Sequence, residues 1–313
     1  MTLPPAAGPG ESATDRAAHE RDVPGLIDTL RAEPNTLVLA VWRGRALVGD
    51  GRLQLLPHTR IVASDPSGPS GSSAAPETVF LGRVSGTAVL LAIVDENRAL
   101  RLAPREHWGE LRVVGGDLPA ADRDLLIEGV ALARWIEEGA HCPVCGAPAE
   151  LRQAGWSRRC TACGREHFPR TDPAVIVAVT DPTGQRLLLG SNAAWGAGRY
   201  SCFAGFVEAG ESAETALVRE VEEEAGVRLS GYEYIGSQAW PYPRSLMLGY
   251  LATAADPAQA RADGEEIVEV RWFTPDEIGV ALAEPGDDGE FTLPGPSSIA
   301  RALIQTWYDR TRA

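Results

Sequence analysis

Residues 205–227 read GFVEAGESAETALVREVEEEAGV, and this stretch carries the strongest signal in the sequence. Glu220, Glu223 and Glu224 are spaced i, i+3 and i+4, so a helix would place all three carboxylates on one face. Like charges at this spacing destabilise a helix unless cations neutralise them. Carboxylate oxygens are the ligands that Mg²⁺ and Mn²⁺ prefer, so this face is a candidate metal site. The alternative is a solvated acidic helix face, which is the usual role of such a charge run.

The residues around these glutamates fit a helix of defined length. Ser212 is suited to cap the start and Gly226 to end the last turn, which predicts a helix over about residues 212–225. Leu217 and Val221 are four residues apart and can anchor this helix to a sheet. A solvated acidic face explains the glutamates, but it does not explain the glycine loop before the helix or the spacing of Glu211 and Arg219.

The stretch resembles the Nudix hydrolase signature, G-x5-E-x7-R-E-U-x-E-E-x-G-U with U aliphatic. Every fixed position is matched, by Gly205, Glu211, Arg219, Glu220, Val221, Glu223, Glu224, Gly226 and Val227. The resemblance implies an α/β/α sandwich around a mixed sheet, so the fold class is mixed α/β. It also implies a hydrolase that uses Mg²⁺ or Mn²⁺ to cleave a phosphoric anhydride.

Four of the five cysteines form two CxxC pairs, each followed by a glycine. The pairs are Cys142 with Cys145 and Cys160 with Cys163. Two residues between ligands let both sulfurs face one ion, and four thiolates suit a closed, structural zinc site. We therefore predict one structural Zn²⁺ per chain, with a redox pair or an iron–sulfur site as the alternatives. His167 is expected to stay outside this site, and Cys202 has no evident partner.

The first part of the chain shows no catalytic pattern. Apolar runs that begin at Leu37, Val79 and Ala88 predict short strands in a small α+β domain. A stretch rich in Ser, Pro and Gly over residues 64–77 reads as a flexible loop. Helical spacing of apolar residues predicts a helix over residues 120–138 that connects this domain to the cysteines. The sequence shows no internal repeat.

A second motif lies beyond the glutamate helix. Residues 237–245 read SQAWPYPRS, which resembles the SQPWPFPxS array of the NADH pyrophosphatase subgroup of Nudix hydrolases. Ala239 stands where the pattern has proline, and Tyr242 where it has phenylalanine. Members of this subgroup carry an N-terminal domain, a four-cysteine zinc ribbon and a Nudix domain. The resemblance implies the same order here: a disordered tail over 1–22, the N-terminal domain over 23–117, a connecting helix over 118–139, the zinc ribbon over 140–168 and the Nudix domain over 169–313.

The resemblance also assigns roles to particular residues. Glu220 and Glu224 match metal ligands, Glu223 matches a ligand or the general base, and Glu266 matches a further metal ligand. Glu265 is adjacent, so the choice between the last two stays open. Substrate contacts are implied at Arg112, Phe168, Ala204, Phe206, Gln238, Ala239, Trp240, Pro241, Tyr242, Pro243, Arg244, Ser245 and Ala300.

The implied reaction is hydrolysis of the pyrophosphate bond of NADH or NAD⁺, which yields reduced or oxidised nicotinamide mononucleotide and AMP. Two other functions remain open: removal of NAD caps from RNA 5′ ends, and a non-catalytic zinc-ribbon and Nudix module that only binds nucleotides. The resemblance further implies a homodimer.

Composition limits the partners and the compartment. The 313 residues carry 29 Lys and Arg against 43 Asp and Glu, a net charge of −14. Sequence-independent binding to long nucleic acid needs a basic surface, so this charge argues against it. No apolar run approaches the ~20 residues of a membrane-spanning helix, and the first residues lack a secretory signal. We therefore expect a cytoplasmic enzyme without a membrane partner.

Overall fold

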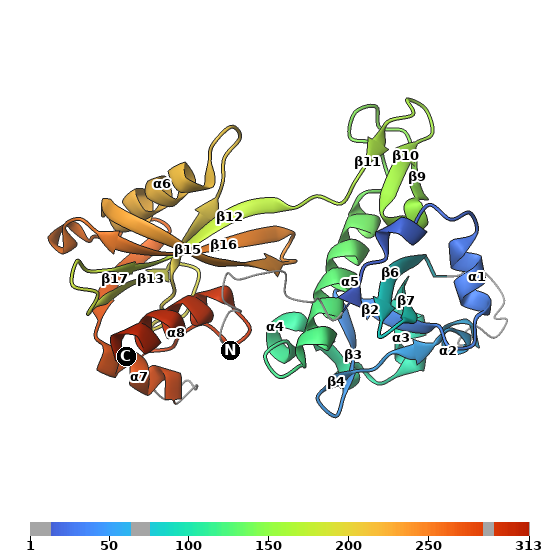
Figure 1. Cartoon of the computed structure of the whole chain (residues 1–313), viewed down its shortest axis with the longest axis horizontal. Helices are drawn as coiled ribbons and strands as arrows, with labels where there is room; N and C mark the ends of the chain where they lie inside the picture. The colour runs from blue at the N-terminus through green and yellow to red at the C-terminus, as the bar shows by residue number, and fades with distance from the viewer. Residues whose placement is uncertain (1–13, 64–75, 284–290, 313) are drawn as a thin grey trace. The chain divides into compact units, whose positions relative to one another are not determined.

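The computed structural model describes residues 14–63, 76–283 and 291–312. These residues form two compact units that divide between Arg170 and Thr171. We call them the N-terminal unit and the C-terminal unit and describe each by itself (Figure 1). The predicted flexible loop over residues 64–77 lies almost entirely outside the described residues. None of the described helices combines the length and the apolar character that crossing a bilayer requires.

The N-terminal unit is built on a mixed sheet with the strand order β1-β6-β7-β2-β3-β4, to which β5 and β8 add at β2 and β3. Strands β2 and β7 run parallel. The strands are β1 Thr14–Asp15, β2 Leu37–Trp42, β3 Arg45–Gly49, β4 Arg52–Leu53, β5 Leu56–Pro57, β6 Thr78–Val84, β7 Thr87–Ile93 and β8 Trp108–Glu110. The helices are η1 Ala18–Glu20, α1 Leu26–Ala32, α2 His58–Ala63, α3 Glu96–Leu102, η2 Arg105–His107, α4 Leu111–Val114 and α5 Ala120–Glu138.

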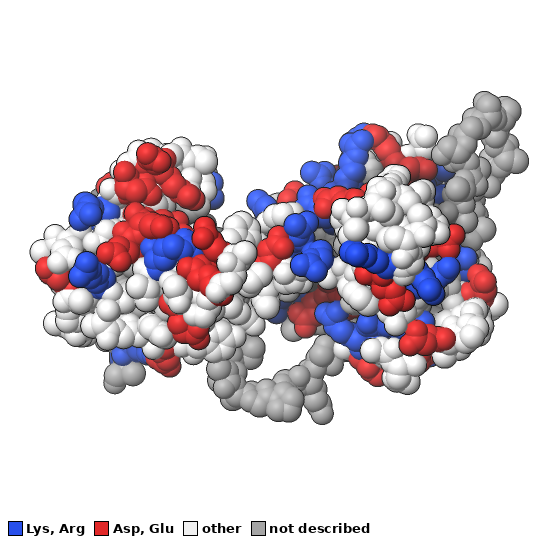
Figure 2. Space-filling model, turned by 90° about the horizontal axis from the view of Figure 1, so that it is seen from above, with Lys and Arg blue, Asp and Glu red and all other residues white. Residues whose placement is uncertain are grey.

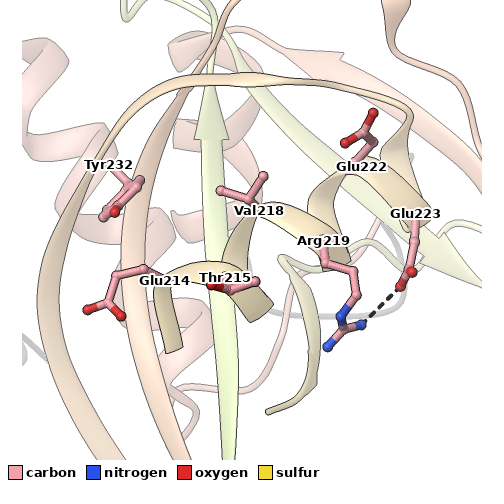
Figure 3. A pocket seen from close by; sticks show the side chains of 7 residues that line it. All are labelled: Glu214, Thr215, Val218, Arg219, Glu222, Glu223 and Tyr232. Carbon is pink, nitrogen blue, oxygen red and sulfur yellow. Dashed lines mark hydrogen bonds and ion pairs between the residues drawn. The ribbon is translucent and has the colours of Figure 1, made fainter. Parts of the chain in front are cut away.

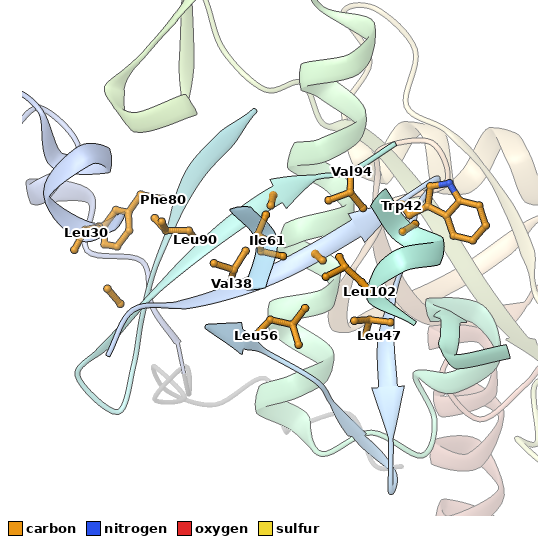
Figure 4. Packing of buried hydrophobic residues seen from close by; sticks show 14 of the residues in the cluster. Leu30, Val38, Trp42, Leu47, Leu56, Ile61, Phe80, Leu90, Val94 and Leu102 are labelled. Atoms are coloured by element: carbon orange, nitrogen blue, oxygen red, sulfur yellow. The ribbon is translucent and has the colours of Figure 1, made fainter. Parts of the chain in front are cut away.

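The apolar strands predicted from the sequence form the core of this unit (Figure 4). Phe80 of β6 is fully buried. The rings of Trp42 and Trp108 meet edge to face with centroids 5.7 Å apart. Helix α5 packs closely on β2, because a Cβ on Gly129 would come within 2.5 Å of the side chain of Leu39. The helix predicted as a connector is thus part of the core of the unit.

The prediction of a disordered tail over residues 1–22 is wrong for residues 14–22. Strand β1 pairs antiparallel with the edge of β6. Ala17 is buried, and the guanidinium of Arg21 lies 3.6 Å from the centroid of the Trp156 ring. The segment is held by a two-residue strand and by a cation–π contact rather than by an amphipathic face. The sequence therefore shows no apolar periodicity from which its order could be predicted.

A three-stranded sheet of order β11-β10-β9 follows α5. Its strands are β9 Ala149–Arg152, β10 Ser157–Cys160 and β11 Glu166–His167, and the short helix η3 Gln153–Gly155 lies between β9 and β10. Arg158 of β10 is buried and donates hydrogen bonds of 2.8 Å to the carbonyls of Ile136 in α5 and Ala149 in β9. These bonds attach this sheet to the last turn of α5.

The C-terminal unit contains a mixed sheet of order β15-β16-β12-β13-β17, with β14 paired to β12. Strands β12 and β16 run parallel. Its elements are β12 Asp172–Thr180, β13 Leu187–Asn192, β14 Phe203–Phe206, α6 Ala213–Ala225, β15 Leu229–Trp240, β16 Ser245–Ala254, η4 Pro257–Gln259, β17 Ile267–Phe273, α7 Pro275–Ala283 and α8 Ile299–Arg312.

Helices cover both faces of this sheet, as the alternation along β12 requires. Val175, Val177 and Val179 pack in one buried cluster with the apolar side of α6. Ile176 and Ala178 point the other way and pack in a second cluster with the apolar side of α8. The predicted α/β/α sandwich is confirmed, and Figure 1 shows α6 and α8 on opposite sides of the sheet.

The two units repeat one topology, which the sequence did not reveal. In each, an antiparallel hairpin (β6 and β7, or β15 and β16) pairs in parallel with a second hairpin (β2 and β3, or β12 and β13). Strands β5 and β14 then occupy corresponding places beside β2 and β12. The helix after β5 is α2, whose residues HTRIVA contain no carboxylate, whereas the helix after β14 is α6. Only the C-terminal copy carries the glutamate face.

Candidate active site and zinc centre

Helix α6 forms where its caps and anchors predict. The hydroxyl of Ser212 accepts a hydrogen bond of 3.2 Å from the backbone N–H of Thr215. Gly226 ends the helix in the left-handed conformation with φ of 66°. Leu217 and Val221 are fully buried against the sheet. The glutamates flank this buried side of the helix, and their exposure differs from one to the next.

Gly205 of β14 allows the closest approach between the sheet and this helix. A Cβ at this position would lie 2.0 Å from the carboxyl carbon of Glu220. Only glycine leaves room for this carboxylate, which explains the first fixed position of the motif. Burial beside the sheet raises the pKa of Glu220, although Arg219 opposes the shift.

Arg219 organises the exposed edge of the site. Its guanidinium binds Glu211 through two hydrogen bonds of 2.9 Å and donates to Glu220 at 2.7 Å and to Glu223 at 3.0 Å. It also donates to the carbonyl of Phe206 at 3.0 Å. The hydrogen bonds from Arg219 are the main reason that the pKa of Glu211 falls to about 2. The arginine and first glutamate of the motif thus hold the loop before α6 in place.

Glu223 lies at the outer edge of this arrangement (Figure 3). Its side chain is 59% exposed, and Figure 3 shows it beside Arg219. Together with Glu214, Thr215, Val218, Glu222 and Tyr232, these two residues line an open hollow on the outer side of α6. The exposed carboxylate is accessible to a cation or to a water molecule.

Glu224 points to the other side, into a cavity, and is 5% exposed. One of its oxygens accepts a hydrogen bond of 3.2 Å from the backbone N–H of Ala204. Burial, together with the charges of Glu266 and Glu220, raises the pKa of Glu224 to about 8. Glu224 and Glu266 line the same cavity, and the charge of Glu220 acts on Glu224. Their carboxylate oxygens are donors of the type that divalent cations such as Mg²⁺ bind.

Glu266 is held at this wall by the loops that surround it. The amide nitrogen of Asn192 donates to its carboxylate at 3.1 Å. A carboxylate oxygen of Asp263 accepts hydrogen bonds from three successive backbone N–H groups, those of residues 265–267. Glu266 lines the cavity with Glu224, whereas Glu265 is not among the lining residues. The geometry favours Glu266 over Glu265.

The cavity encloses about 290 Å³ and has a mostly apolar wall. Six of the residues named from the sequence line it together: Ala204, Glu224, Gln238, Trp240, Glu266 and Ala300. Gln238 uses both ends of its amide, because it donates to the carbonyl of Ser297 and accepts from the N–H of Ile299, both at 2.8 Å. It therefore fixes the start of α8 against β15.

The remaining residues of the SQAWPYPRS array lie around the turn between β15 and β16 and are not among the lining residues: Ala239, Pro241, Tyr242, Pro243, Arg244 and Ser245. The ring of Tyr242 packs against that of Trp240 at 5.3 Å. Arg244 donates to Asp172 at 2.9 Å. These side chains support the turn that presents Trp240.

Three other residues named from the sequence lie outside the cavity lining. Phe206, at the end of β14, is 53% exposed. Arg112 lies on α4, and Phe168 directly follows β11 with 52% exposure. Because the last two belong to the N-terminal unit, their assignment to the substrate stays a prediction.

The four predicted zinc ligands converge. The Sγ atoms of Cys142, Cys145, Cys160 and Cys163 all lie within 4.8 Å of one another, and they are the only such group of three or more His, Cys, Asp or Glu in residues 14–63, 76–283 and 291–312. The pKa of the Cys160 thiol falls to about 6, mainly because the backbone N–H of Cys163 donates a hydrogen bond to its sulfur. Four thiolates at this spacing fit a closed tetrahedral zinc site.

His167 is not part of the converging group of four ligands, as predicted, but it lies beside that group. Its Nε2 atom lies 3.2 Å from the Sγ of Cys142. The ring is therefore a hydrogen-bonding neighbour of the zinc thiolates, as is common around metal ligands. The pairing of β11 with β10, which brings the ring to the sulfur, was not evident from the spacing of the cysteines.

Among the lining residues that were not named from the sequence as site residues are Asn192, Trp195 and Cys202. None belongs to a motif: Asn192 ends β13, and Trp195 lies in the loop that follows. The thiol of Cys202 is buried, which raises its pKa to about 12, so it is an inert part of the wall. In the sequence, the signal for this loop is a tryptophan, Trp195, followed by Gly196 and Gly198.

Comparison with known proteins agrees with this geometry. Residues 170–293 match the NUDIX domain model, and the chain is a Nudix hydrolase. Residues 140–168 match the NADH pyrophosphatase zinc ribbon domain, and residues 35–135 match the NADH pyrophosphatase-like rudimentary NUDIX domain. The chain belongs to the NADH pyrophosphatase family of Nudix hydrolases.

Curated relatives extend over most of the chain. The chain is 38% identical over 276 residues to proteins named NAD-capped RNA hydrolase NudC from Mycobacterium bovis and Mycobacterium tuberculosis, and the match covers 85% of this chain and 83% of each relative. It is 34% identical over 198 residues to the human NAD-capped RNA hydrolase NUDT12, covering 61% of this chain and 42% of that protein.

Proposed function

We propose that this enzyme hydrolyses the pyrophosphate of NADH and NAD⁺ and releases nicotinamide mononucleotide, reduced or oxidised, and AMP. The observation that carries the proposal is the meeting of Glu224 and Glu266 with Gln238, Trp240 and Ala300 in one cavity. Its volume of about 290 Å³ is at the lower end of ligand sites, which suits one mononucleotide half. The wall of carboxylates marks where the pyrophosphate must lie.

We propose that Glu220, Glu224 and Glu266 hold the catalytic cation, Mg²⁺ or Mn²⁺. When bound, the cation neutralises the phosphates and lowers the pKa of the attacking water. Glu223 acts as a further ligand or as the base that accepts a proton from the water. The water oxygen bonds to phosphorus, the anhydride P–O bond breaks, and the leaving mononucleotide keeps the bridging oxygen. Arg219 positions Glu223 and Glu220 for these roles.

NAD-capped RNA is a second candidate substrate, because the relatives named above are NAD-capped RNA hydrolases. A cavity that encloses one mononucleotide half leaves the other half free to continue into an RNA chain. Arg112, Phe168 and Phe206 are proposed contacts of the substrate outside the cavity. The acidic surface implies that an RNA is recognised through its cap rather than through general attraction of its phosphates.

Product analysis tests both substrates. The purified enzyme is incubated with NADH, NAD⁺ and NAD-capped RNA, each with Mg²⁺ or with Mn²⁺, and the products are separated by chromatography. We expect mononucleotide products from NADH, and comparison of kcat/KM ranks the substrates. Binding of NADH without turnover under any condition would instead establish the non-catalytic module.

We further propose a homodimer, as the family resemblance implies, and a cytoplasmic location, because a four-thiolate site requires a compartment that keeps cysteines reduced. Analytical ultracentrifugation and cell fractionation test these two proposals. For domain limits, we propose 140–168 for the zinc ribbon and 169–313 for the Nudix domain. The N-terminal domain, proposed over 23–117, is extended to include residues 14–22 and α5.

A further inference from the structure

Trp195 has an unusual place beside the cavity. It is 42% exposed, although a tryptophan side chain gains more than most from leaving water. Its side chain lines the cavity together with Glu224, Glu266 and Trp240. In the described part of the chain, no other aromatic ring packs against it, whereas Trp240 packs against Tyr242. The indole is thus a partly exposed aromatic surface that borders a cavity with a mostly apolar wall.

The loop that carries Trp195 is fixed to the loop of Glu266. The N–H of Ala193 donates to the carbonyl of Glu266 at 2.8 Å, and the side chain of Asn192 donates to its carboxylate at 3.1 Å. Asn192 also closes the turn, because its side-chain oxygen accepts from Ala194 at 2.9 Å and its carbonyl accepts from Trp195 at 3.0 Å. The indole is therefore held in a defined position relative to the wall that receives the phosphates.

We propose that Trp195 binds the substrate by stacking on the flat heteroaromatic ring of the mononucleotide half that enters this cavity. The inference rests on the proposed dinucleotide pyrophosphatase activity and names a substrate contact that lies outside both sequence motifs. When a substrate ring enters an apolar cavity, the cavity wall shields one face of the ring from water. The indole of Trp195 would shield the second face. Aromatic platforms of this kind hold bases without reading their identity. Trp195 contributes to substrate affinity and does not take part in bond cleavage.

Steady-state kinetics of NADH hydrolysis test this role with Trp195→Ala and Trp195→Phe. Loss of one base–aromatic stack lowers affinity by roughly tenfold or more, so we expect Trp195→Ala to raise KM by about that factor while kcat changes little. Trp195→Phe keeps a ring and should stay within a few-fold of the wild type. Tyr234→Ala is the matched control, because Tyr234 is 45% exposed on β15 and does not line the cavity.

Product inhibition identifies the ring. AMP and nicotinamide mononucleotide are each added as inhibitors, and the one that stacks on Trp195 should inhibit the alanine variant about tenfold less well than the wild type. Unchanged KM and unchanged inhibition by both nucleotides would overturn the proposal. A fall in kcat alone, or an equal effect of Tyr234→Ala, would overturn it as well.

Direct binding separates this proposal from the proposed function. If the wild type does not hydrolyse NADH, the proposed function fails, and calorimetric titration of wild type and Trp195→Ala with AMP and with nicotinamide mononucleotide still measures the stack. Weaker binding of one nucleotide to the variant, with unchanged thermal melting, supports Trp195 as the platform. Equal binding of both nucleotides to the two proteins refutes it.

Discussion

At the scale of single residues, the two faces of α6 give Glu223 and Glu224 different environments. Glu223 is exposed and bound to Arg219, whereas burial, with a contribution from neighbouring carboxylates, raises the pKa of Glu224 to about 8. We predict that Glu223→Gln and Glu224→Gln each lower kcat for NADH on the order of a hundredfold or more, since a lost metal-site carboxylate removes several kcal/mol of transition-state stabilisation.

Glu222→Gln provides the matched control for these variants. Its side chain is 52% exposed on the same helix and pairs with Arg228. We expect it to retain turnover. Without added metal, Glu224→Gln should melt at or above the wild-type temperature at pH 8, because burying its charge is unfavourable there. Near-wild-type turnover of both active-site variants would mean that the acidic face is only solvated surface.

A second buried carboxylate predicts a pH-dependent stability of the N-terminal unit. Glu128 of α5 is 5% exposed, and burial raises its pKa from 4.5 to about 7 against the opposing charges of Arg16 and Arg21, while Asp124 adds to the rise. The folded state favours the protonated form of Glu128. Its contribution to the free energy of unfolding is therefore fully present below pH 4.5 and is lost as the pH rises through 7. The full loss is about 3 kcal/mol.

Glu128→Gln mimics the protonated carboxyl at every pH. We therefore expect the variant to be more stable than the wild type by up to about 3 kcal/mol at pH 8 and nearly equal at pH 5. Thermal or urea unfolding at the two pH values measures the difference. Glu138→Gln, at an exposed position of the same helix, should show no such pH dependence. A destabilised Glu128→Gln at pH 8 would show that the ion pair with Arg16, not burial, dominates.

At the scale of elements, the sequence predicted those structures that have strong local signals. Helix α6 could be placed because Ser212, Gly226 and the buried Leu217 and Val221 act within one segment. Helix α5 was placed for the same reason. Strand β1 was missed because it is held by pairing with β6, to which no local pattern points.

The same distinction applies to the site. The glutamates and cysteines have spacings that their metal chemistry requires, so they were found from the sequence. Trp195 and Asn192 reach the cavity through a loop whose course depends on the pairing of β13 with β17. The separation of Glu223 from Glu224 also depends on the tertiary position of Arg219. Spacing along a helix shows which residues share a face but not which of them is buried.

Arg158 connects two elements and offers a test of that connection. Its two hydrogen bonds of 2.8 Å, to Ile136 and Ala149, are made by a buried charged group. We predict that Arg158→Met destabilises the N-terminal unit by about 2–4 kcal/mol, since hydrogen bonds to charged groups contribute about 1.5–3 kcal/mol each and are not additive. Arg159→Met, its exposed neighbour on β10, is the control and should change the free energy of unfolding little. Equal effects of the two substitutions in urea unfolding would contradict this role.

At the scale of the whole molecule, the net charge of −14 bears on how a polyphosphate substrate approaches the enzyme. Figure 2 shows acidic side chains gathered on one face of the C-terminal unit, with basic side chains among them. A polyphosphate approaches such a surface only where cations compensate the charge. The paired Arg219 compensates part of it, and the remaining carboxylates at the cavity wall are the place where the proposed catalytic cation is required.

The zinc centre and the active site belong to different compact units, and this predicts two separable roles for metals. The four cysteines lie in the N-terminal unit, where Arg158 bonds the ribbon to α5, and the glutamates lie in the C-terminal unit. We expect one Zn²⁺ per chain in protein purified without added zinc. Because structural zinc binding supplies folding free energy, removal of zinc by a chelator, with Mg²⁺ kept in excess, should destabilise the ribbon and the end of α5.

Hydrogen exchange followed by mass spectrometry should then show lost protection in β9, β10 and β11 and retained protection in β12 and β16. Cys160→Ser should reproduce the pattern, and re-addition of zinc should reverse it only in the wild type. Substoichiometric zinc, bound iron, or loss of protection in β12 and β16 before the ribbon would contradict a structural zinc site.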